Sequence, residues 1–433
     1  KKDGGLHAPT VDIKGPGFNL LGDHFHPLLV LLGPVYWLFP SGLTLLVVQD
    51  LLFAASAVPI MRLASARLGD RLGAAVGVSY LMSWGLWSAV ESQFHEIAFA
   101  VPLISYSLCS WIESEGRSRS AIVSMAALVF VKEDLGLTVA AFGLVVIWIE
   151  WGRTTREGDF DLYVRSLTSL MATLRSRTAR IGAGLAAWGI LWTLLAITVI
   201  LPAIHPGGTW EYTDRLSQTD TMTTGPFTRL IFPTVKLQTL GLLALAAGVI
   251  GAVSPYMWIM VPTLAWRFLG NVDFYWGWHW HYSAILVPMA VVALIDSAHR
   301  RRRIRGAAAL AVAVSLCSNL AVAWTSTIDQ FFDRQPHALT ARQRTAAEGA
   351  VAIAGSGHRV VASLRLLAYL VPDNRGFWEG TAKGADVDVV AVDPASAASS
   401  SGEAADKWAE ERFGGRWRIV YLKEGYQVAV RIE

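Results

Sequence analysis

Apolar stretches separated by short polar connections make up most of the chain before residue 325. A helix needs about 20 apolar residues to cross a bilayer, or about 17 where its ends snorkel or the membrane thins. The pattern therefore predicts about ten membrane spans within residues 41–324, at about 41–61, 73–90, 97–112, 120–131, 135–151, 181–201, 237–253, 256–270, 282–297 and 306–324. Before them, residues 1–40 are expected to form an outer loop. Its apolar stretch 27–39 is short and contains Pro34, which indicates an interfacial or re-entrant helix.

The pattern changes after Trp324, where charged and small polar residues return and apolar runs become short. Alternating runs at 359–363 and 386–392 are typical of strands, and the segments near 337–350 and 402–413 are helical in pattern. Two final runs, 417–422 and 426–432, flank Glu424-Gly425 and predict a β-hairpin. Residues 325–433 are therefore expected to form a small α/β domain, with a flexible loop at 395–402.

Arginines occur in alternate connections between the predicted spans, and such connections face the cytoplasm. They are Arg62, Arg67 and Arg71; Arg117 and Arg119; Arg153, Arg156, Arg165, Arg175, Arg177 and Arg180; and Arg300 to Arg303 with Arg305. Ser254-Pro255 supplies the remaining inner turn, because proline breaks a helix. This topology predicts a multi-pass plasma-membrane protein with both termini and the α/β domain outside the cytoplasm, and it predicts a further helix ahead of residue 1.

Composition supports the membrane interpretation and excludes one class of partner. The chain is 53% hydrophobic and 16% charged, so it has too little polar material to cover a soluble globule, and lipid must solvate much of its surface. The formal net charge is +3, with the arginines spread over separate loops. Nucleic acid is therefore not an expected partner, whereas membrane lipid is.

Five predicted outer loops bring acids, imidazoles and indoles to the same membrane face. They are residues 22–27, 91–96, 132–134, 205–212 and 275–282. Such a set supports three kinds of chemistry: a carboxylate accepts a proton from a hydroxyl, Lys and protonated His hold a phosphate, and His with carboxylates ligates a divalent metal. The residues alone do not choose among these.

Several of these residues also have a purely structural interpretation. Asp23 is a good helix N-cap ahead of Pro27, and the 274–282 run matches an interfacial belt of Trp and Tyr. Arg267 at its helix end suits snorkelling as well as contact with a lipid phosphate. We interpret His205-Pro206 and Glu211-Tyr212 as loop structure rather than as part of a site. Charges at 132–134 near the membrane boundary, in contrast, are costly unless they are paired, which favours a functional role.

A set of ordered motifs carries a family resemblance over nearly the whole chain. They are Gly-Asp-His-Phe-x-Pro at 22–27, Phe-His-Glu at 94–96, Lys-Glu-Asp-Leu-Gly at 132–136, Ser-Pro at 254–255 followed by Pro-Thr-Leu-x-Trp-Arg-Phe-Leu, and Tyr-Trp-Gly followed by His-Tyr-Ser. The chain resembles a family of predicted bacterial membrane proteins of unknown function, common in actinobacteria and grouped with the GT-C glycosyltransferase superfamily. The expected fold is therefore mainly α, a GT-C-like polytopic bundle with a small extracytoplasmic α/β domain.

The resemblance implies an inverting transferase that uses a polyprenyl-phosphate-linked sugar and a cell-envelope glycan or lipid acceptor at the outer face. It implies Asp23 as the catalytic base, no certain cofactor and a possible divalent metal ion. The residues expected to bind substrate or phosphate are His24, His26, His95, Glu96, Lys132, Glu133, Asp134, Arg267, His279, His281 and Tyr282.

Two other classes of function stay open at this stage. A lipid or solute transporter predicts ionisable residues near the bilayer midplane, and the predicted spans contain almost none there. A non-catalytic metal-binding or envelope-assembly protein would keep the histidines but would not require Lys132 and Arg267. The sugar and the acceptor are not encoded in any motif that we recognise.

Overall fold

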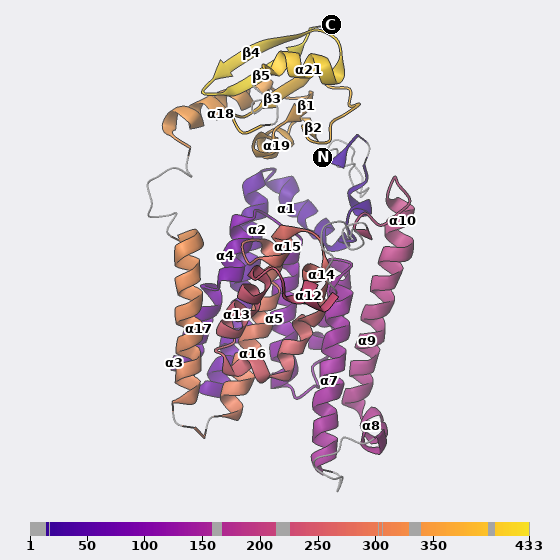
Figure 1. Cartoon of the computed structure of the whole chain (residues 1–433), viewed down its shortest axis with the longest axis vertical. Helices are drawn as coiled ribbons and strands as arrows, with labels where there is room; N and C mark the ends of the chain where they lie inside the picture. The colour runs from indigo at the N-terminus through magenta and orange to yellow at the C-terminus, as the bar shows by residue number, and fades with distance from the viewer. Residues whose placement is uncertain are drawn as a thin grey trace.

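The computed structural model describes residues 14–16, 18–157, 167–213, 226–301, 303–304, 306–328, 339–396 and 403–432. Within them a helical bundle occupies the part before residue 329, and a small α/β domain lies beyond one end of it (Figure 1). The predicted loop at 395–402 falls largely outside the described residues. The α/β domain and the segment that begins at Lys14 lie at the same end of the molecule (Figure 1).

The first half of the bundle begins with a short helical segment, as the 27–39 stretch predicts. Its helices are η2 (Leu20–Gly22), η3 (Pro27–Leu31), α1 (Leu32–Leu38), α2 (Gly42–Leu68), α3 (Asp70–Leu81), α4 (Trp84–Glu91), α5 (Ile97–Glu113), α6 (Arg119–Ala126), η4 (Ala127–Phe130) and α7 (Leu135–Glu157). Side-chain caps fix two of these starts, since Ser41 accepts from the Leu43 amide and Ser118 from the Ala121 amide. Gly69, with φ of 90°, allows the chain to turn between α2 and α3.

The second half of the bundle contains shorter and more interrupted helices. They are α8 (Leu167–Leu174), α9 (Arg177–Leu195), η5 (Ala196–Ile200), α10 (Leu201–Ile204), α12 (Pro226–Ile231), α13 (Val235–Ala246), η6 (Ile250–Val253), η7 (Pro255–Met260), α14 (Val261–Leu269), α15 (Asp273–Trp276), η8 (His281–Ser283), α16 (Leu286–Arg300), α17 (Ala307–Ala323) and η9 (Trp324–Ile328). The predicted break at Ser254-Pro255 is confirmed: Ser254 is extended and caps the Tyr256 amide.

Each predicted span contains helix, but fewer helices than ten are long and apolar enough to cross a membrane. Among the described residues there are four, or up to five if the bent pair Asp273–Ser283 and Leu286–Arg300 forms one span. The four are Gly42–Leu68, Leu135–Thr155, Arg177–Ile204 and Ala307–Ser326. The others are shortened by breaks, such as the one between α3 and α4. A count of ten spans therefore stays a prediction, as do the orientation and the outside position of both ends.

Helices α7 and α9 pack closely because glycines face each other across the contact. A Cβ added at Gly136 would lie 2.5 Å from the Gly189 carbonyl oxygen, and one at Gly182 would lie 2.6 Å from the Gly143 carbonyl oxygen. Small residues allow such close backbone approach between helices in a membrane. This contact sets the position of the N-terminal end of α7, where Lys132, Glu133 and Asp134 lie.

The C-terminal domain is a five-stranded sheet with helices on both faces. Its strands are β1 (Arg359–Ala362), β2 (Arg375–Trp378), β3 (Val389–Val392), β4 (Trp417–Lys423) and β5 (Tyr426–Arg431), in the order β2-β1-β3-β5-β4. Strands β2, β1 and β3 are parallel, and β5 is antiparallel to β3 and β4. Val360 pairs with Gly376 and Val389, which sets the register of the parallel part. The predicted α/β character and the hairpin at Glu424-Gly425 are confirmed, whereas β2 was not predicted.

Three helices cover this sheet: α18 (Ala341–Ala354), α19 (Leu364–Leu370) and α21 (Ala405–Phe413). Buried Trp408 of α21 packs on one face with Val390, and Ala350 of α18 packs on the other with Val360 and Leu367. Helix α18 begins with a capping box between Thr340 and Gln343. Helix α19 lies on the side nearest the bundle (Figure 1), where Ala368 is close to Gly42 at the start of α2.

Candidate functional site

Four loops meet at the end of the bundle nearest the C-terminal domain, and we call their polar residues the loop cluster. It consists of Asp23, His24, His26, His95, Glu96, Lys132, Glu133, Asp134, His281 and Tyr282. Most of these residues directly precede or begin a helix: η3, α5, α7 or η8. The amide ends of helices carry partial positive charge, which favours carboxylates such as Glu96 and Asp134 at these positions.

Asp23 is a buried carboxylate that is contacted through only one of its two oxygens. Its Oδ1 accepts a hydrogen bond from the Tyr212 hydroxyl at 3.1 Å and lies 3.1 Å from the Lys14 Nζ. Both contacts fall on Oδ1, so within the described residues Oδ2 has no partner. Burial raises the pKa of Asp23, but the charges of His24 and Lys14 and these hydrogen bonds outweigh burial and the net pKa is lowered. Asp23 is therefore ionised at neutral pH.

His24 links Asp23 to Glu133 through Tyr212. The Tyr212 hydroxyl lies 2.7 Å from the His24 Nε2, and the His24 Nδ1 lies 2.7 Å from the Glu133 Oε1. Tyr212 gives its only proton to Asp23, so its oxygen accepts the Nε2–H of His24, while Nδ1–H donates to Glu133. Burial and Lys132 lower the pKa of His24, but Glu133 and Glu96 outweigh them and the net pKa is raised. Both ring nitrogens of His24 donate hydrogen bonds only when the imidazole is protonated, so the protonated form makes both contacts at once.

Glu133 has contacts on its backbone and side chain that fix its position. Its Oε2 accepts the Phe25 amide at 3.0 Å, and its backbone carbonyl accepts the Thr193 hydroxyl of α9 at 2.9 Å. Only 3% of the residue is exposed, so its charge needs this hydrogen bonding. The loop from η2 and the start of α7 are therefore joined to α9 at the site.

Lys132 is the main cation of the cluster. Its Nζ lies 2.8 Å from the Glu96 Oε1. Burial lowers the pKa of Lys132, but the charges of Glu96, Asp134 and Glu133 outweigh burial, so the pKa of Lys132 is well above its usual range. Burial raises the pKa of Glu96, but Lys132 outweighs burial, so the pKa of Glu96 is well below its usual range.

Asp134 differs from Lys132 and Glu96, because burial is the largest cause of its shift and raises its pKa to about 6. Its Oδ1 is buried without a hydrogen-bond partner among the described residues.

Neutral imidazoles line the other side of Lys132. The His95 and His281 rings stack with centroids 3.5 Å apart, and the Tyr282 ring lies 4.0 Å from the His281 ring. Burial lowers the pKa values of His95 and His26. The Nδ1 atoms of His26 and His281 are buried with no hydrogen-bond partner in the described part of the chain. Buried polar atoms are usually hydrogen-bonded, so these two nitrogens are candidates for contact with a ligand.

Two residues predicted to bind substrate or phosphate lie outside the loop cluster. Arg267 is fully buried and donates to the Tyr275 and Gly277 carbonyl oxygens at 2.8 and 2.7 Å and to the Ser283 hydroxyl at 3.2 Å. Its contacts fold the 270–283 segment, so we now expect it to position Tyr282 rather than to hold a phosphate. His279 is exposed, and its ring lies 3.8 Å from that of Trp278.

A comparison with known protein families identifies the family to which this chain belongs. Residues 4–428 match the family described as predicted membrane protein (DUF2079). The chain belongs to that family. No curated protein and no solved structure matches this DUF2079 protein. The family description together with the long apolar helices identifies a membrane protein, and it names no activity.

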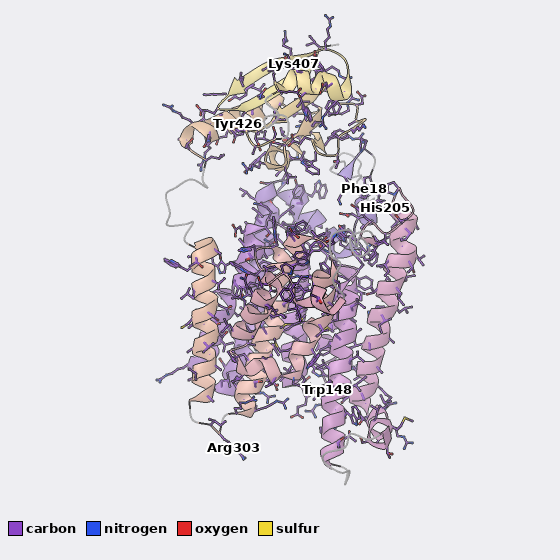
Figure 2. All side chains as sticks on the ribbon, in the orientation of Figure 1. Phe18, Trp148, His205, Arg303, Lys407 and Tyr426 are labelled. Carbon is purple, nitrogen blue, oxygen red and sulfur yellow. The ribbon has the colours of Figure 1, made fainter. Side chains whose placement is uncertain are left out.

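The DUF2079 site also contains residues that sequence reasoning missed. Tyr212, which we interpreted as loop structure, instead bridges Asp23 and His24, so that interpretation is wrong. Lys14 was not considered, and Gln49 accepts the His95 amide at 3.1 Å from α2. His205 keeps a structural role, because its ring packs edge-on against Phe18 at 5.4 Å (Figure 2). The polarity of the 205–212 loop was the only signal for Tyr212.

The sequence predicted a divalent metal ion as a possible cofactor. Among the residues that the structure describes, no three His, Cys, Asp or Glu side chains lie so that they could hold a metal ion. In the loop cluster the imidazoles and carboxylates instead contact each other or lysines, as His24 does with Glu133 and Glu96 with Lys132.

Proposed function

We propose that this membrane protein is a GT-C-like glycosyltransferase that moves a sugar from a polyprenyl-phosphate donor to a glycan or lipid acceptor at the outer membrane face. One observation carries the proposal: Asp23, an ionised carboxylate with a free oxygen, lies in the same cluster as the cation Lys132 and as His24, whose pKa is raised by neighbouring carboxylates. A transferase of this kind needs a base for the acceptor and positive charge for the departing phosphate. The apolar helices beside the cluster suit a donor with a long lipid chain.

In the proposed reaction Asp23 is the base. Its Oδ2 accepts the proton of the acceptor hydroxyl while that oxygen forms a bond to the anomeric carbon from the face opposite the phosphate. The bond between the anomeric carbon and the phosphate oxygen breaks, and polyprenyl phosphate leaves with the electron pair. The anomeric configuration is therefore inverted. Lys14 and Tyr212 keep Asp23 ionised and fixed through Oδ1.

Charge on the leaving phosphate is balanced by residues on the other side of the cluster. Lys132 is fully charged and is held by Glu96, so it meets the phosphate without first having to be ordered. The protonated His24 adds a second positive charge beside it. His26 and His281, with unpaired Nδ1 atoms, are placed to bind hydroxyl groups of the sugar.

Transport and non-catalytic metal binding are less well supported. A transporter is expected to place ionisable groups near the middle of the membrane, whereas the residues of the loop cluster lie at one end of the bundle, next to the starts of η3, α5, α7 and η8. A metal-binding protein is expected to direct its imidazoles at an ion, whereas His24 contacts Glu133 and Tyr212, and His95 stacks on His281.

The proposal is tested by deleting the gene and profiling glycans and lipid-linked sugars by mass spectrometry. The expected result is loss of one envelope glycan together with accumulation of its polyprenyl-phosphate sugar donor, and both changes revert when the wild-type chain is restored. A deletion that leaves every glycan and every lipid-linked sugar unchanged would contradict a transferase function.

A further inference from the structure

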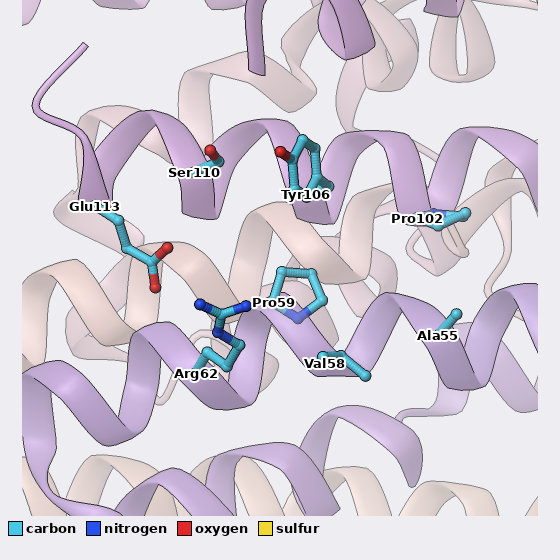
Figure 3. A pocket seen from close by; sticks show the side chains of 8 residues that line it. All are labelled: Ala55, Val58, Pro59, Arg62, Pro102, Tyr106, Ser110 and Glu113. Carbon is cyan, nitrogen blue, oxygen red and sulfur yellow. The ribbon is translucent and has the colours of Figure 1, made fainter. Parts of the chain in front are cut away.

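A groove opens between α2 and α5 at some distance from the loop cluster. Its volume is about 420 Å³, and it is lined by Ala55, Val58, Pro59, Arg62, Pro102, Tyr106, Ser110 and Glu113 (Figure 3). A proline lies inside each of the two helices, Pro59 in α2 and Pro102 in α5. Prolines inside helices remove a backbone hydrogen bond and bend the helix, which accounts for a gap in an otherwise close contact.

The groove faces the surroundings of the bundle rather than its core. Val58 is 55% exposed and Tyr106 is 40% exposed, although both are apolar or aromatic residues. Helix α2 is one of the four that are long and apolar enough to span a membrane, so its exposed apolar side chains face lipid. Arg62 lies about 30 Å along α2 from its start near the C-terminal domain, since a helix rises about 1.5 Å per residue.

Two opposite charges point into this groove without contacting each other. Arg62 comes from α2 and Glu113 from the end of α5, and their charged groups face the same space (Figure 3). In the described part of the chain the two form no ion pair, and neither has another charged partner. The nearby hydroxyls do have partners, Tyr106 with Ser120 at 2.7 Å and Ser110 with Ser118 at 2.9 Å.

Separated charges at a lipid-facing groove favour a ligand that carries both signs. Arg62 and Glu113 are both exposed, so each can meet an opposite charge on a lipid headgroup at the membrane surface. A phosphate beside an ammonium group, as in an aminophospholipid such as phosphatidylethanolamine, offers an acceptor to Arg62 and donors to Glu113 at the same time. An anionic lipid would satisfy Arg62 alone, and a choline headgroup has no N–H to give to Glu113.

We propose that this groove binds one zwitterionic aminophospholipid, with its phosphate on Arg62 and its ammonium on Glu113. An acyl chain then lies along Val58 and Ala55 toward the middle of the membrane. The site is at the far end of the bundle from the loop cluster, and it is independent of the proposed glycosyltransferase activity.

Native mass spectrometry of the full-length protein tests this site. The purified chain is exchanged into phosphatidylethanolamine, phosphatidylglycerol or phosphatidylcholine with identical acyl chains, and retained lipid is counted. Wild type is expected to retain one phosphatidylethanolamine with about tenfold preference, because one charged hydrogen bond corresponds to about that factor. Glu113→Gln should remove the preference over phosphatidylglycerol, and Arg62→Gln should weaken retention of both.

Matched controls lie close by but outside the groove. Glu115 is exposed and paired with Arg117, and Arg71 is exposed on α3. Glu115→Gln and Arg71→Gln should both retain lipid as wild type does. The proposal is overturned if wild type shows no headgroup preference, if Glu113→Gln keeps it, or if the control variants lose lipid to the same extent as the groove variants.

Discussion

Lys132, whose side chain is 12% exposed, and the fully buried Arg267 are two cations at the same end of the bundle, and they are held in different ways. Lys132 meets the side chain of Glu96, whereas Arg267 donates to backbone carbonyls and to Ser283. The first arrangement pairs opposite side-chain charges within the loop cluster. The second arrangement uses the donors of Arg267 to fold the aromatic segment 270–283. Under the proposed function, Lys132 belongs to the reactive region and Arg267 to the scaffold that supports it.

The largest effect on stability is expected at Lys132. Lys132→Met leaves the Glu96 carboxylate buried without its cation, and removing one partner of such a pair costs about 3–5 kcal/mol. The free energy of unfolding in a constant detergent measures this loss. The double variant Lys132→Met with Glu96→Gln should recover most of it while staying inactive. A single variant as stable as wild type would contradict the paired-charge description.

The variant Arg267→Lys tests whether Arg267 supports the fold of segment 270–283 or contacts the substrate. A lysine cannot reproduce the planar set of donors that meets Tyr275, Gly277 and Ser283, so we expect a loss of about 2–3 kcal/mol. Because Arg267 is assigned a positioning role, product formed per folded molecule should fall much less than it does for Lys132→Met. Equal losses of specific activity in the two variants would show that Arg267 contacts the substrate.

Asp134, beside Lys132 in the loop cluster, is expected to make the free energy of unfolding depend on pH. Folding raises its pKa from 3.8 to about 6, so its contribution to stability is greatest below 3.8 and is lost as the pH rises through about 6. Asp134→Asn should therefore be more stable than wild type by about 1–3 kcal/mol at pH 7 and above. The two proteins should converge as the pH falls to about 3.8 and below, where the carboxyl is protonated in both the folded and the unfolded state. A variant that is less stable at pH 7 would contradict the unpaired burial of this carboxyl.

The smallest effect is expected at His279. Its ring is exposed and meets only the neighbouring Trp278 among the aromatic contacts of the described residues. His279→Ala should change the free energy of unfolding by less than about 0.5 kcal/mol and leave product formation unchanged. A large loss of product with normal stability would place His279 in the site, as the sequence pattern predicted.

Much of the architecture was predictable because it depends on local pattern. Apolar runs located the helical segments, and the Glu424-Gly425 turn located the β4–β5 hairpin. Helix breaks inside the apolar runs were harder to foresee, as between α3 and α4, because composition there does not change. Strand β2 was missed because its four residues include Arg375 and Gly376, which hide any alternation.

The candidate site was predictable as a set of loops but not as a set of contacts. Counting arginines and polar loops indicated that residues around Asp23, Glu96 and Lys132 would meet, and they do. The partners of Asp23 could not be found in this way, because Tyr212 is 189 positions away along the chain. The backbone carbonyls around Arg267 could not be foreseen either, because sequence does not reveal which groups surround a cation.

The most direct test of the central claim is restoration of a deletion strain with Asp23→Asn, beside wild type and Asp273→Asn. Asp273 is an exposed carboxylate in α15, which makes it a matched control. The account predicts that Asp23→Asn inserts at wild-type abundance yet lowers glycan product by a factor of about 100 or more, with accumulation of the polyprenyl-phosphate sugar. The control should restore the glycan fully. Full restoration by Asp23→Asn at normal abundance would contradict Asp23 as the base.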